Sequence, residues 1–235
     1  KSESNILKKL QSKTSNGQNL WKKANNYISG GSMLLSKNPE RYLPNFWPTY
    51  FKSAKGCIIT DLNQNKFIDF SLMGVGTNVL GYANSKIDNE VKKNITKSNM
   101  STLNCAEEVL LAEKLIELHP WANKVRFART GGEANAVAIR IARAASKKDN
   151  VAFCGYHGWH DWYLSTNLNG KRGKKNLDTH LIKGLKVEGV PKNLKQTAFP
   201  FNYGDFSALK KLISEKNIGI IKMEVCRNTK PDKTF

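Results

Sequence analysis

RFARTGGEANAVAIRIARA, residues 126–144, is the stretch that decides the fold class of this chain. The short segment KVRFA at 124–128 predicts a β-strand, and the compact apolar run 151–154 predicts a second one. Between them, residues 132–146 predict a helix, because apolar side chains recur on one helical face: Ala134, Val137, Ala138, Ile141 and Ala145. Strand, helix and strand in this order predict a βαβ unit with parallel strands and a right-handed crossover.

The turn that starts this helix allows two interpretations. Thr130 followed three residues later by Glu133 is a capping box, which needs no ligand. Alternatively, Thr130, Gly131 and Gly132 bring a hydroxyl group and free backbone amides to the positive end of a helix, which suits a phosphate. Spacing alone leaves both interpretations open.

The α/β pattern continues toward the end of the chain. Residues 205–217 predict an amphipathic helix capped by Asp205, and 218–225 predict another buried strand. In an open parallel sheet, ligands bind beyond the carboxyl ends of the strands. The chemistry is therefore expected after Ala128, after Cys154 and around Glu224.

The second strand end, GYHGWHDWYLS at 155–165, is rich in aromatic residues. Flat rings such as Tyr156 and His157 suit stacking on a planar ligand, and packing is the competing interpretation. The His157-x-x-His160 spacing has no third ligand of clear spacing, so we predict no metal site. The third strand end offers the carboxylate of Glu224, which needs solvent or a partner.

Upstream, the chain is less regular. Residues 1–28 predict one or two short helices, and 29–51 predict a proline-containing loop. Residues 57–60 and 66–70 predict a hairpin with a polar turn. Apolar periodicity predicts two amphipathic helices within 85–98 and 105–120.

The composition of the chain bears on which partners it binds and where in the cell it is found. The net charge is +19, but the lysines are spread along the chain, and the basic stretch 170–196 lacks the aromatic residues that stack on bases. We therefore expect a solvated loop there and no nucleic acid partner. The four cysteines form no CxxC pair and are predicted to be buried thiols. No apolar run is long enough for a bilayer, so a soluble cytoplasmic protein without membrane contact is expected.

Taken in order, the three strand ends resemble the class III (fold type I) pyridoxal-phosphate-dependent aminotransferases. The nearest branch by this resemblance is the glutamate-1-semialdehyde 2,1-aminomutase-like one, through SGGSMLLSK at 29–37. Segments 56–70 and 74–84 are also similar to family patterns. The family's phosphate turn, ring-stacking segment and late strand end stand here as Thr130-Gly131-Gly132-Glu133-Ala134, Tyr156-His157-Gly158 and Met223-Glu224-Val225.

The resemblance implies an α/β fold: the fold type I large domain, a mainly parallel sheet flanked by helices, with its C-terminal part missing. Residues 1–69 would be an N-terminal segment with a β-hairpin, and 70–235 an incomplete cofactor domain. Pyridoxal 5'-phosphate would be held by Thr130, Gly131 and Gly132 through its phosphate, by Tyr156 or His157 at the ring face, and by Glu224 near the ring. A small-molecule amino donor and acceptor and a homodimer are also implied.

This sequence departs from the family pattern at several positions, and the departures weaken the prediction of the substrate more than that of the cofactor. Gly132 replaces a hydroxyl residue, and Val225 replaces a proline. Leu34 and Lys37 stand where the aminomutases carry a serine and an arginine for the substrate carboxylate, and lysine makes no bidentate contact. Lys37 is the candidate substrate contact.

The resemblance places the Schiff-base lysine and the acid that pairs with the pyridine nitrogen beyond Phe235. We therefore expect no catalytic residue in this chain and no activity from it alone. The choice between transaminase and aminomutase stays open. Two other classes also stay open: a different phosphate-binding α/β enzyme for a nucleotide or sugar, and a non-catalytic basic binding protein.

Overall fold

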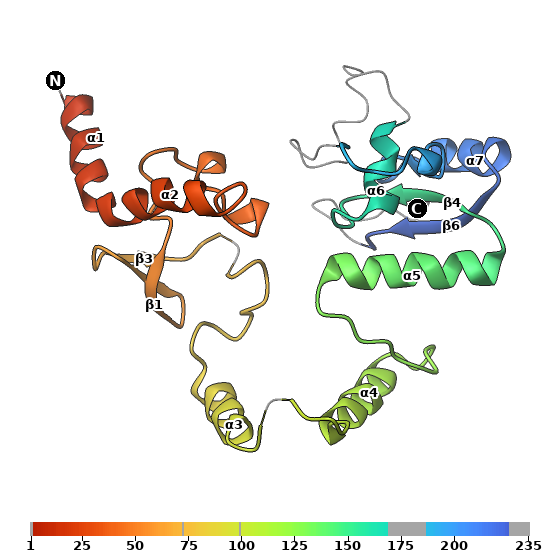
Figure 1. Cartoon of the computed structure of the whole chain (residues 1–235), viewed down its shortest axis with the longest axis horizontal. Coiled ribbons are helices and arrows are strands. Elements are labelled where there is room, and N and C mark those ends of the chain that lie inside the picture. The colour runs from red at the N-terminus through yellow and green to blue at the C-terminus, as the bar shows by residue number, and fades with distance from the viewer. Residues whose placement is uncertain (1, 72, 99, 169–186, 226–235) are drawn as a thin grey trace. The chain divides into compact units, whose positions relative to one another are not determined.

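A computed structural model describes residues 2–71, 73–98, 100–168 and 187–225. The chain divides into two compact units, Lys1–Cys105 and Ala106–Phe235, which are described separately here (Figure 1). Most of the predicted basic loop, residues 170–186, and Cys226 lie outside the described residues. The division predicted after residue 69 stays a prediction.

The first unit begins with the two predicted helices, α1 (Ser2–Lys13) and α2 (Ser15–Tyr27). Between α2 and the first strand lie two single 3-10 turns, η1 (Leu35–Lys37) and η2 (Pro39–Arg41). Trp21 and Ala24 of α2 are buried. Gly31 has a positive φ of 72°, and a methyl carbon there would lie 2.4 Å from the Trp21 ring. The glycine of the SGG segment is therefore explained by close packing on Trp21.

A three-stranded antiparallel sheet follows, with strand order β1-β2-β3. The predicted hairpin is confirmed as β2 (Ile58–Asp61) and β3 (Lys66–Ile68), with Ile59 opposite Phe67. β1 (Phe51–Lys55) was not predicted. Its sequence, FKSAK, has one large apolar side chain and hence no alternating pattern to detect.

The turn between β2 and β3 is organised by Asp61, a buried carboxylate. Asp61 Oδ1 accepts hydrogen bonds from the amides of Asn63 at 2.9 Å and Asn65 at 2.8 Å. Asn65 Nδ2 in turn donates to the Lys13 carbonyl at 2.6 Å. This polar turn therefore joins the sheet to the junction between α1 and α2.

Residues after the sheet remain tied to the first unit. Gly56 and Tyr82 form an isolated antiparallel bridge, and Tyr82 Oη donates to Asp69 Oδ2 at 2.6 Å. Burial, followed by this bond to Asp69, raises the pKa of Tyr82 to about 12. The predicted helix α3 (Ser85–Ile95) starts next, capped by Asn84 Oδ1, which accepts from the Lys86 amide at 3.1 Å.

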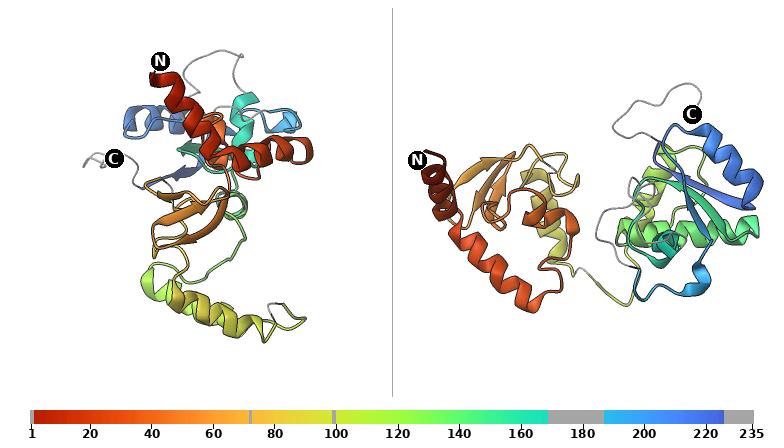
Figure 2. Two further views of the ribbon diagram at one scale, coloured as in Figure 1. Left: turned by 90° about the vertical axis from the view of Figure 1, so that its left-hand side faces the viewer. Right: turned by 90° about the horizontal axis from the view of Figure 1, so that it is seen from above.

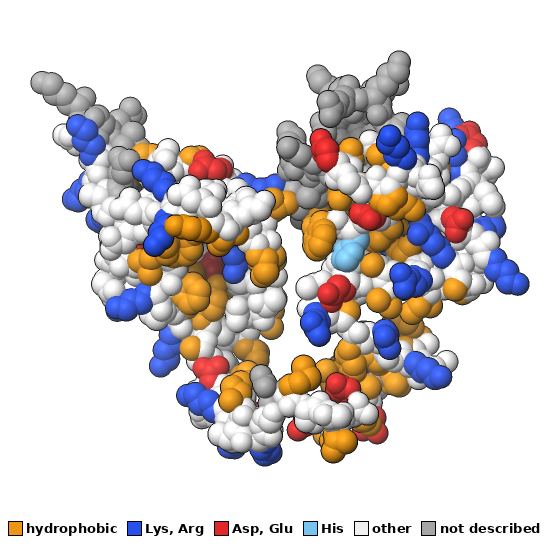
Figure 3. All heavy atoms as spheres, viewed as in Figure 1, with side chains coloured by type: hydrophobic (Ala, Val, Ile, Leu, Met, Phe, Trp, Pro, Cys, Tyr) orange, Lys and Arg blue, Asp and Glu red, His pale blue; other side chains and the backbone are white. Residues whose placement is uncertain are grey.

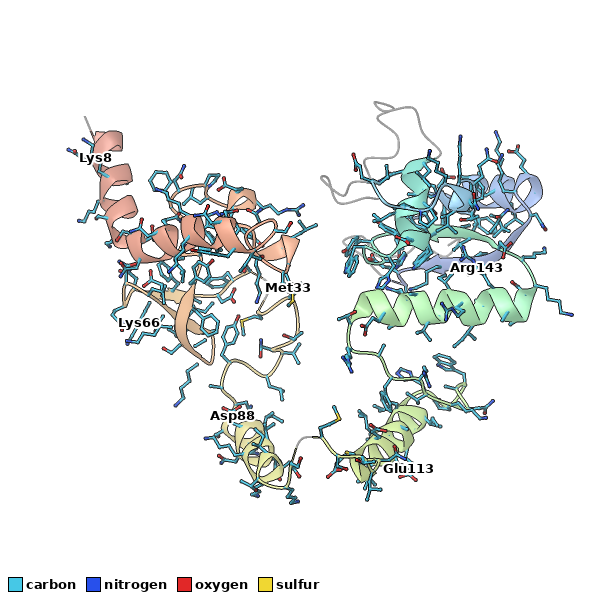
Figure 4. All side chains as sticks on the ribbon, in the orientation of Figure 1. Lys8, Met33, Lys66, Asp88, Glu113 and Arg143 are labelled. Atoms are coloured by element: carbon cyan, nitrogen blue, oxygen red, sulfur yellow. The ribbon has the colours of Figure 1, made fainter. Side chains whose placement is uncertain are left out.

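The second unit begins with the other predicted helix, α4 (Ala106–Leu118). Figure 4 shows Glu113 on α4 and Asp88 on α3. Several large apolar side chains of α4 are exposed, at 52% to 62%: Val109, Leu110, Leu111 and Leu118.

The core of the second unit is a parallel sheet with strand order β5-β4-β6. Its strands are β4 (Asn150–Cys154), β5 (Ala198–Pro200) and β6 (Ile218–Met223), and β4 pairs in parallel with both neighbours. Helix α5 (Gly131–Ser146) lies along one side of the sheet and α7 (Phe206–Glu215) along the other (Figures 1 and 2). The predicted parallel sheet flanked by helices is confirmed.

Side chains of β4 alternate between two buried clusters. Val151 and Phe153 pack toward α5 with Ile139, whereas Ala152 and Cys154 pack toward α7. The short helix α6 (Asp161–Leu164) adds aromatic rings to the α5 side. Full burial of a side chain such as Phe153 contributes roughly 1.5–3 kcal/mol. The complete burial of residues 151–154 explains the continuous apolar run of β4.

The strand predicted at 124–128 is wrong, because these residues form no strand. Both edges of β4 are occupied by β5 and β6, so 124–128 does not pair with β4. The parallel pairs form instead between β4 and two later strands. One of these, β5, escaped prediction because it is only three residues long.

The helix predicted from 132 to 146 forms, but its buried face differs from the predicted stripe. Ala134, Ala138 and Ala145 are exposed, as is Ile141 at 58%, whereas Ile139 is buried at 2% exposure. Alanines surround α5 on several sides, so the pattern could not identify which face meets the sheet.

The structure corrects the prediction that the cysteines are buried and bears on the expectations about membranes and surface charge. Cys57 and Cys105 are exposed, and only Cys154 of the described cysteines is a buried thiol. Cys57 lies in the turn between β1 and β2, where its side chain is exposed. Within the described ranges, no helix combines the length and apolar character needed to cross a membrane. On the face shown in Figure 3, lysines and arginines are scattered over both units.

Candidate functional site

The turn before α5 forms a helix cap. Thr130 has extended backbone angles, and its Oγ1 accepts a hydrogen bond from the Glu133 amide at 3.2 Å. Glu133 Oε2 accepts from the Arg129 amide at 2.9 Å, one residue earlier than in an ordinary capping box. In the part of the chain that is described, the amides of Gly131 and Gly132 have no acceptor, so they remain available at the positive end of α5.

The aromatic loop after β4 packs directly on this turn. Gly158 has a positive φ of 105°, and a methyl carbon there would lie only 3.0 Å from Gly132 Cα. Asn135 Nδ2 of α5 donates to the His157 carbonyl at 3.2 Å. Two of the three predicted strand-end motifs, the Thr-Gly-Gly turn and the Tyr-His-Gly segment, are thus in contact.

His157 is a buried part of this loop, with 3% of its surface exposed. Its Nε2 donates to the Cys154 carbonyl at 2.8 Å, and its ring lies edge-on to Phe153 and stacks with Trp162. Burial, and then the positive charge of Lys222, lower the pKa of His157. Its ring is therefore enclosed by protein and favours the neutral imidazole.

Tyr156 has the opposite character, because 37% of its surface is exposed. Tyr163 supports it through an edge-on contact, with ring centroids 5.7 Å apart. Partial burial raises the pKa of the Tyr156 phenol. Of the two rings predicted for stacking, Tyr156 is the one that retains an exposed surface.

Glu224 lies at the third strand end, directly after β6. A methyl carbon at Gly155 would lie 2.9 Å from Glu224 Cδ, so this carboxyl group rests on the backbone at the end of β4. Gly155 has a positive φ of 94° and no side chain, which permits the close approach. The structure therefore brings Glu224 beside the start of the aromatic loop.

The structure places two further side chains near the site that the sequence analysis did not predict there, Lys222 and His160. Lys222 pairs with Phe153 across β4 and β6, and burial lowers its pKa while Glu224 opposes that shift. Strand alternation from Ile220 could have placed Lys222 on the α5 side. His160 lies beside Gly132, a contact that the His157-x-x-His160 spacing does not indicate.

The remaining predicted residue, Lys37, belongs to the first unit. It ends the 3-10 turn η1 and is exposed. Its predicted contact with a substrate carboxylate stays a prediction. Among the described residues, no group of three or more His, Cys, Asp or Glu side chains could hold a metal ion.

Comparisons with known proteins show the family to which this chain is similar. The family described as aminotransferase class-III matches residues 42–217. A 3-aminobutyryl-CoA aminotransferase from Cloacimonas acidaminovorans is 30% identical over 202 residues, covering 86% of this chain and 44% of the relative. A glutamate-1-semialdehyde 2,1-aminomutase from Methanobrevibacter smithii is 32% identical over 212 residues, covering 88% and 46%.

A solved transaminase with PLP bound has the same fold, with a TM-score of 0.73 at 22% identity. The match covers 90% of this chain and 47% of that structure. The chain thus spans about half the length of the curated relatives and of the solved structure that it matches.

Proposed function

Because the chain belongs to the class-III aminotransferase family, we propose that the protein takes part in pyridoxal-phosphate-dependent amino-group transfer. The reaction would be that of a transaminase or of an aminomutase of the glutamate-1-semialdehyde type, as in the relatives described above. The contribution of residues 1–235 is to hold and orient the cofactor. The Schiff-base lysine stays an expectation for sequence beyond Phe235.

The observation that carries this proposal is the contact between the cap of α5 and the loop after β4. A methyl carbon added at Gly158 would lie 3.0 Å from Gly132 Cα, so the two motifs pack closely at this point. An anion at the α5 end and a planar ring beside Tyr156 would therefore have adjacent positions. A phosphorylated planar cofactor has both parts.

The phosphate would be held by Thr130, Gly131 and Gly132. Space beside Gly131 is open, since a methyl carbon there would meet no atom within 4 Å, and the unpaired amides offer hydrogen bonds to an anion. The helix dipole of a 16-residue helix adds a favourable field. These features fit a phosphate monoester.

The ring of the cofactor would lie on the exposed side of Tyr156, with Glu224 close by. His157 would support the loop from beneath through its bond to the Cys154 carbonyl. Pyridoxal phosphate, when bound, supplies an electron-withdrawing ring that labilises bonds at the carbon carrying the amino group. The protein's own groups here position that ring.

Lys37 is proposed as a substrate contact for a carboxylate. A small-molecule amino donor and acceptor are proposed as partners, and the location is proposed to be the cytoplasm.

A homodimer is proposed as well, and the exposed apolar side chains of α4 supply surface that another protein chain could cover.

The test is a titration of the purified chain with pyridoxal phosphate, followed by absorbance and tryptophan fluorescence. We expect saturable binding, weaker binding of pyridoxal, which lacks the phosphate, and no competition from ATP at equal concentration. Competition by a nucleotide would favour the other phosphate-binding enzymes. Salt-sensitive binding of RNA or DNA without uptake of pyridoxal phosphate would favour a basic binding protein.

A further inference from the structure

The space beside Gly132 is filled by a side chain from another part of the chain. A methyl carbon added to Gly132 would lie 2.9 Å from His160 Cδ2 and 3.0 Å from His160 Nε2. The imidazole thus occupies the volume that a side chain at residue 132 would take. Trp159 stacks on the His160 ring, with ring centroids 4.9 Å apart, and so supports its orientation.

His160 Nε2 is buried from solvent and has no hydrogen-bond partner among the described residues. A buried polar nitrogen without a partner is costly, typically by about 1–3 kcal/mol. The nearby amides of Gly131 and Gly132 are donors and have no acceptor among those residues. Three nitrogen atoms around the start of α5 therefore lack a hydrogen-bond partner among the described residues. A single oxyanion could accept from all three when the imidazole carries its hydrogen on Nε2.

From this cradle, we propose that His160 is a phosphate-binding residue. Its imidazole replaces the missing side chain of Gly132 and donates a hydrogen bond from Nε2 to the phosphate of the cofactor. This inference rests on the proposed function, because it names a further residue of the same site. It also explains how the turn tolerates a glycine where the family pattern has a hydroxyl group.

The experiment measures the dissociation constants of the full chain for pyridoxal phosphate and for pyridoxal. His160→Ala is expected to weaken pyridoxal phosphate binding about tenfold, the usual effect of losing one hydrogen bond to a charged group. Pyridoxal binding should change little, because the phosphate is absent. His160→Gln, which keeps an N–H donor, should retain most of the affinity.

A double-mutant cycle tests the shared volume. Gly132→Ser alone should weaken binding, because its side chain meets the imidazole. Gly132→Ser combined with His160→Ala should bind pyridoxal phosphate more tightly than His160→Ala, because the serine hydroxyl enters the vacated space. Far-UV circular dichroism and thermal unfolding of each variant check that the fold is kept.

The outcomes separate this inference from the proposed function. If the unaltered chain binds pyridoxal phosphate and His160→Ala binds it equally well, the inference is wrong and the proposed function stands. An equal loss of affinity for pyridoxal and pyridoxal phosphate would also overturn it, since that pattern indicates a loop distortion. If the unaltered chain binds neither compound, both are wrong.

Discussion

Thr130 illustrates how one side chain serves both stability and binding. Its hydroxyl group caps α5 through the Glu133 amide, and the same group lies at the proposed phosphate position. The two interpretations left open by the spacing are therefore compatible, because a hydroxyl oxygen has two lone pairs and one hydrogen.

Thr130→Ala should lower the free energy of unfolding by about 1 kcal/mol through the lost cap, and should also weaken pyridoxal phosphate binding. Denaturant unfolding and cofactor titration measure the two effects. The matched control is Asp205→Ala, which removes the cap of α7, where Asp205 Oδ1 accepts from the Ala208 amide at 2.8 Å. It should cost similar stability and leave binding unchanged. An unchanged cofactor affinity in Thr130→Ala would contradict the phosphate role.

His157 should make the stability of the folded chain depend on pH. Its folded-state pKa lies below the value of about 6.5 that applies when the chain is unfolded. As pH falls below about 6.5, the unfolded chain gains a proton there before the folded chain does, so the free energy of unfolding decreases. Above that pH the contribution is fully present.

Urea unfolding of the chain and of His157→Gln between about pH 5 and pH 7.5 measures this effect. The variant should be less stable at neutral pH and show a smaller loss toward pH 5. Parallel curves for the two proteins would show that His157 does not titrate differently in the folded state.

At the scale of an element, two isoleucines test which side of helix α5 packs against the sheet. Ile139 and Ile141 are two residues apart on one helix, with 2% and 58% exposure, so they form a matched pair. Ile139→Ala should cost about 2–5 kcal/mol, because it leaves a cavity among Val151, Phe153 and Ile220. Ile141→Ala should change stability by less than about 0.5 kcal/mol. Equal costs in thermal or urea unfolding would mean that the buried face of α5 has been misidentified.

At the scale of the whole molecule, the sequence predicts elements whose signals are local. Helix α7 follows from its stripe and its Asp205 cap, and β4 from its apolar run. Elements that depend on distant partners were less predictable. Strands β1 and β5 carry little sequence pattern, and 124–128 resembles a strand in sequence but forms none. Strand formation is a property of pairing, which a single segment does not encode.

The candidate site also has features that the sequence predicts and features that only the folded structure shows. The rule that ligands bind at strand ends singled out Thr130, Tyr156 and Glu224, and the resemblance supplied their proposed roles. The relation of His160 to Gly132 was not predictable, because two motifs had to be folded together before one ring could fill the space of a missing side chain. Burial also decided which of Tyr156 and His157 keeps an exposed ring.

The strand order β5-β4-β6 has a practical consequence for handling the purified chain. Among the described residues, β6 pairs along one edge only, and Ile221 on this strand is 48% exposed. An open edge of this kind is a template on which strands of other molecules add, which leads to aggregates. If the edge of β6 is open in solution, we expect light scattering by residues 1–235 to rise with protein concentration, and a short β-forming peptide that pairs with this edge should reduce it.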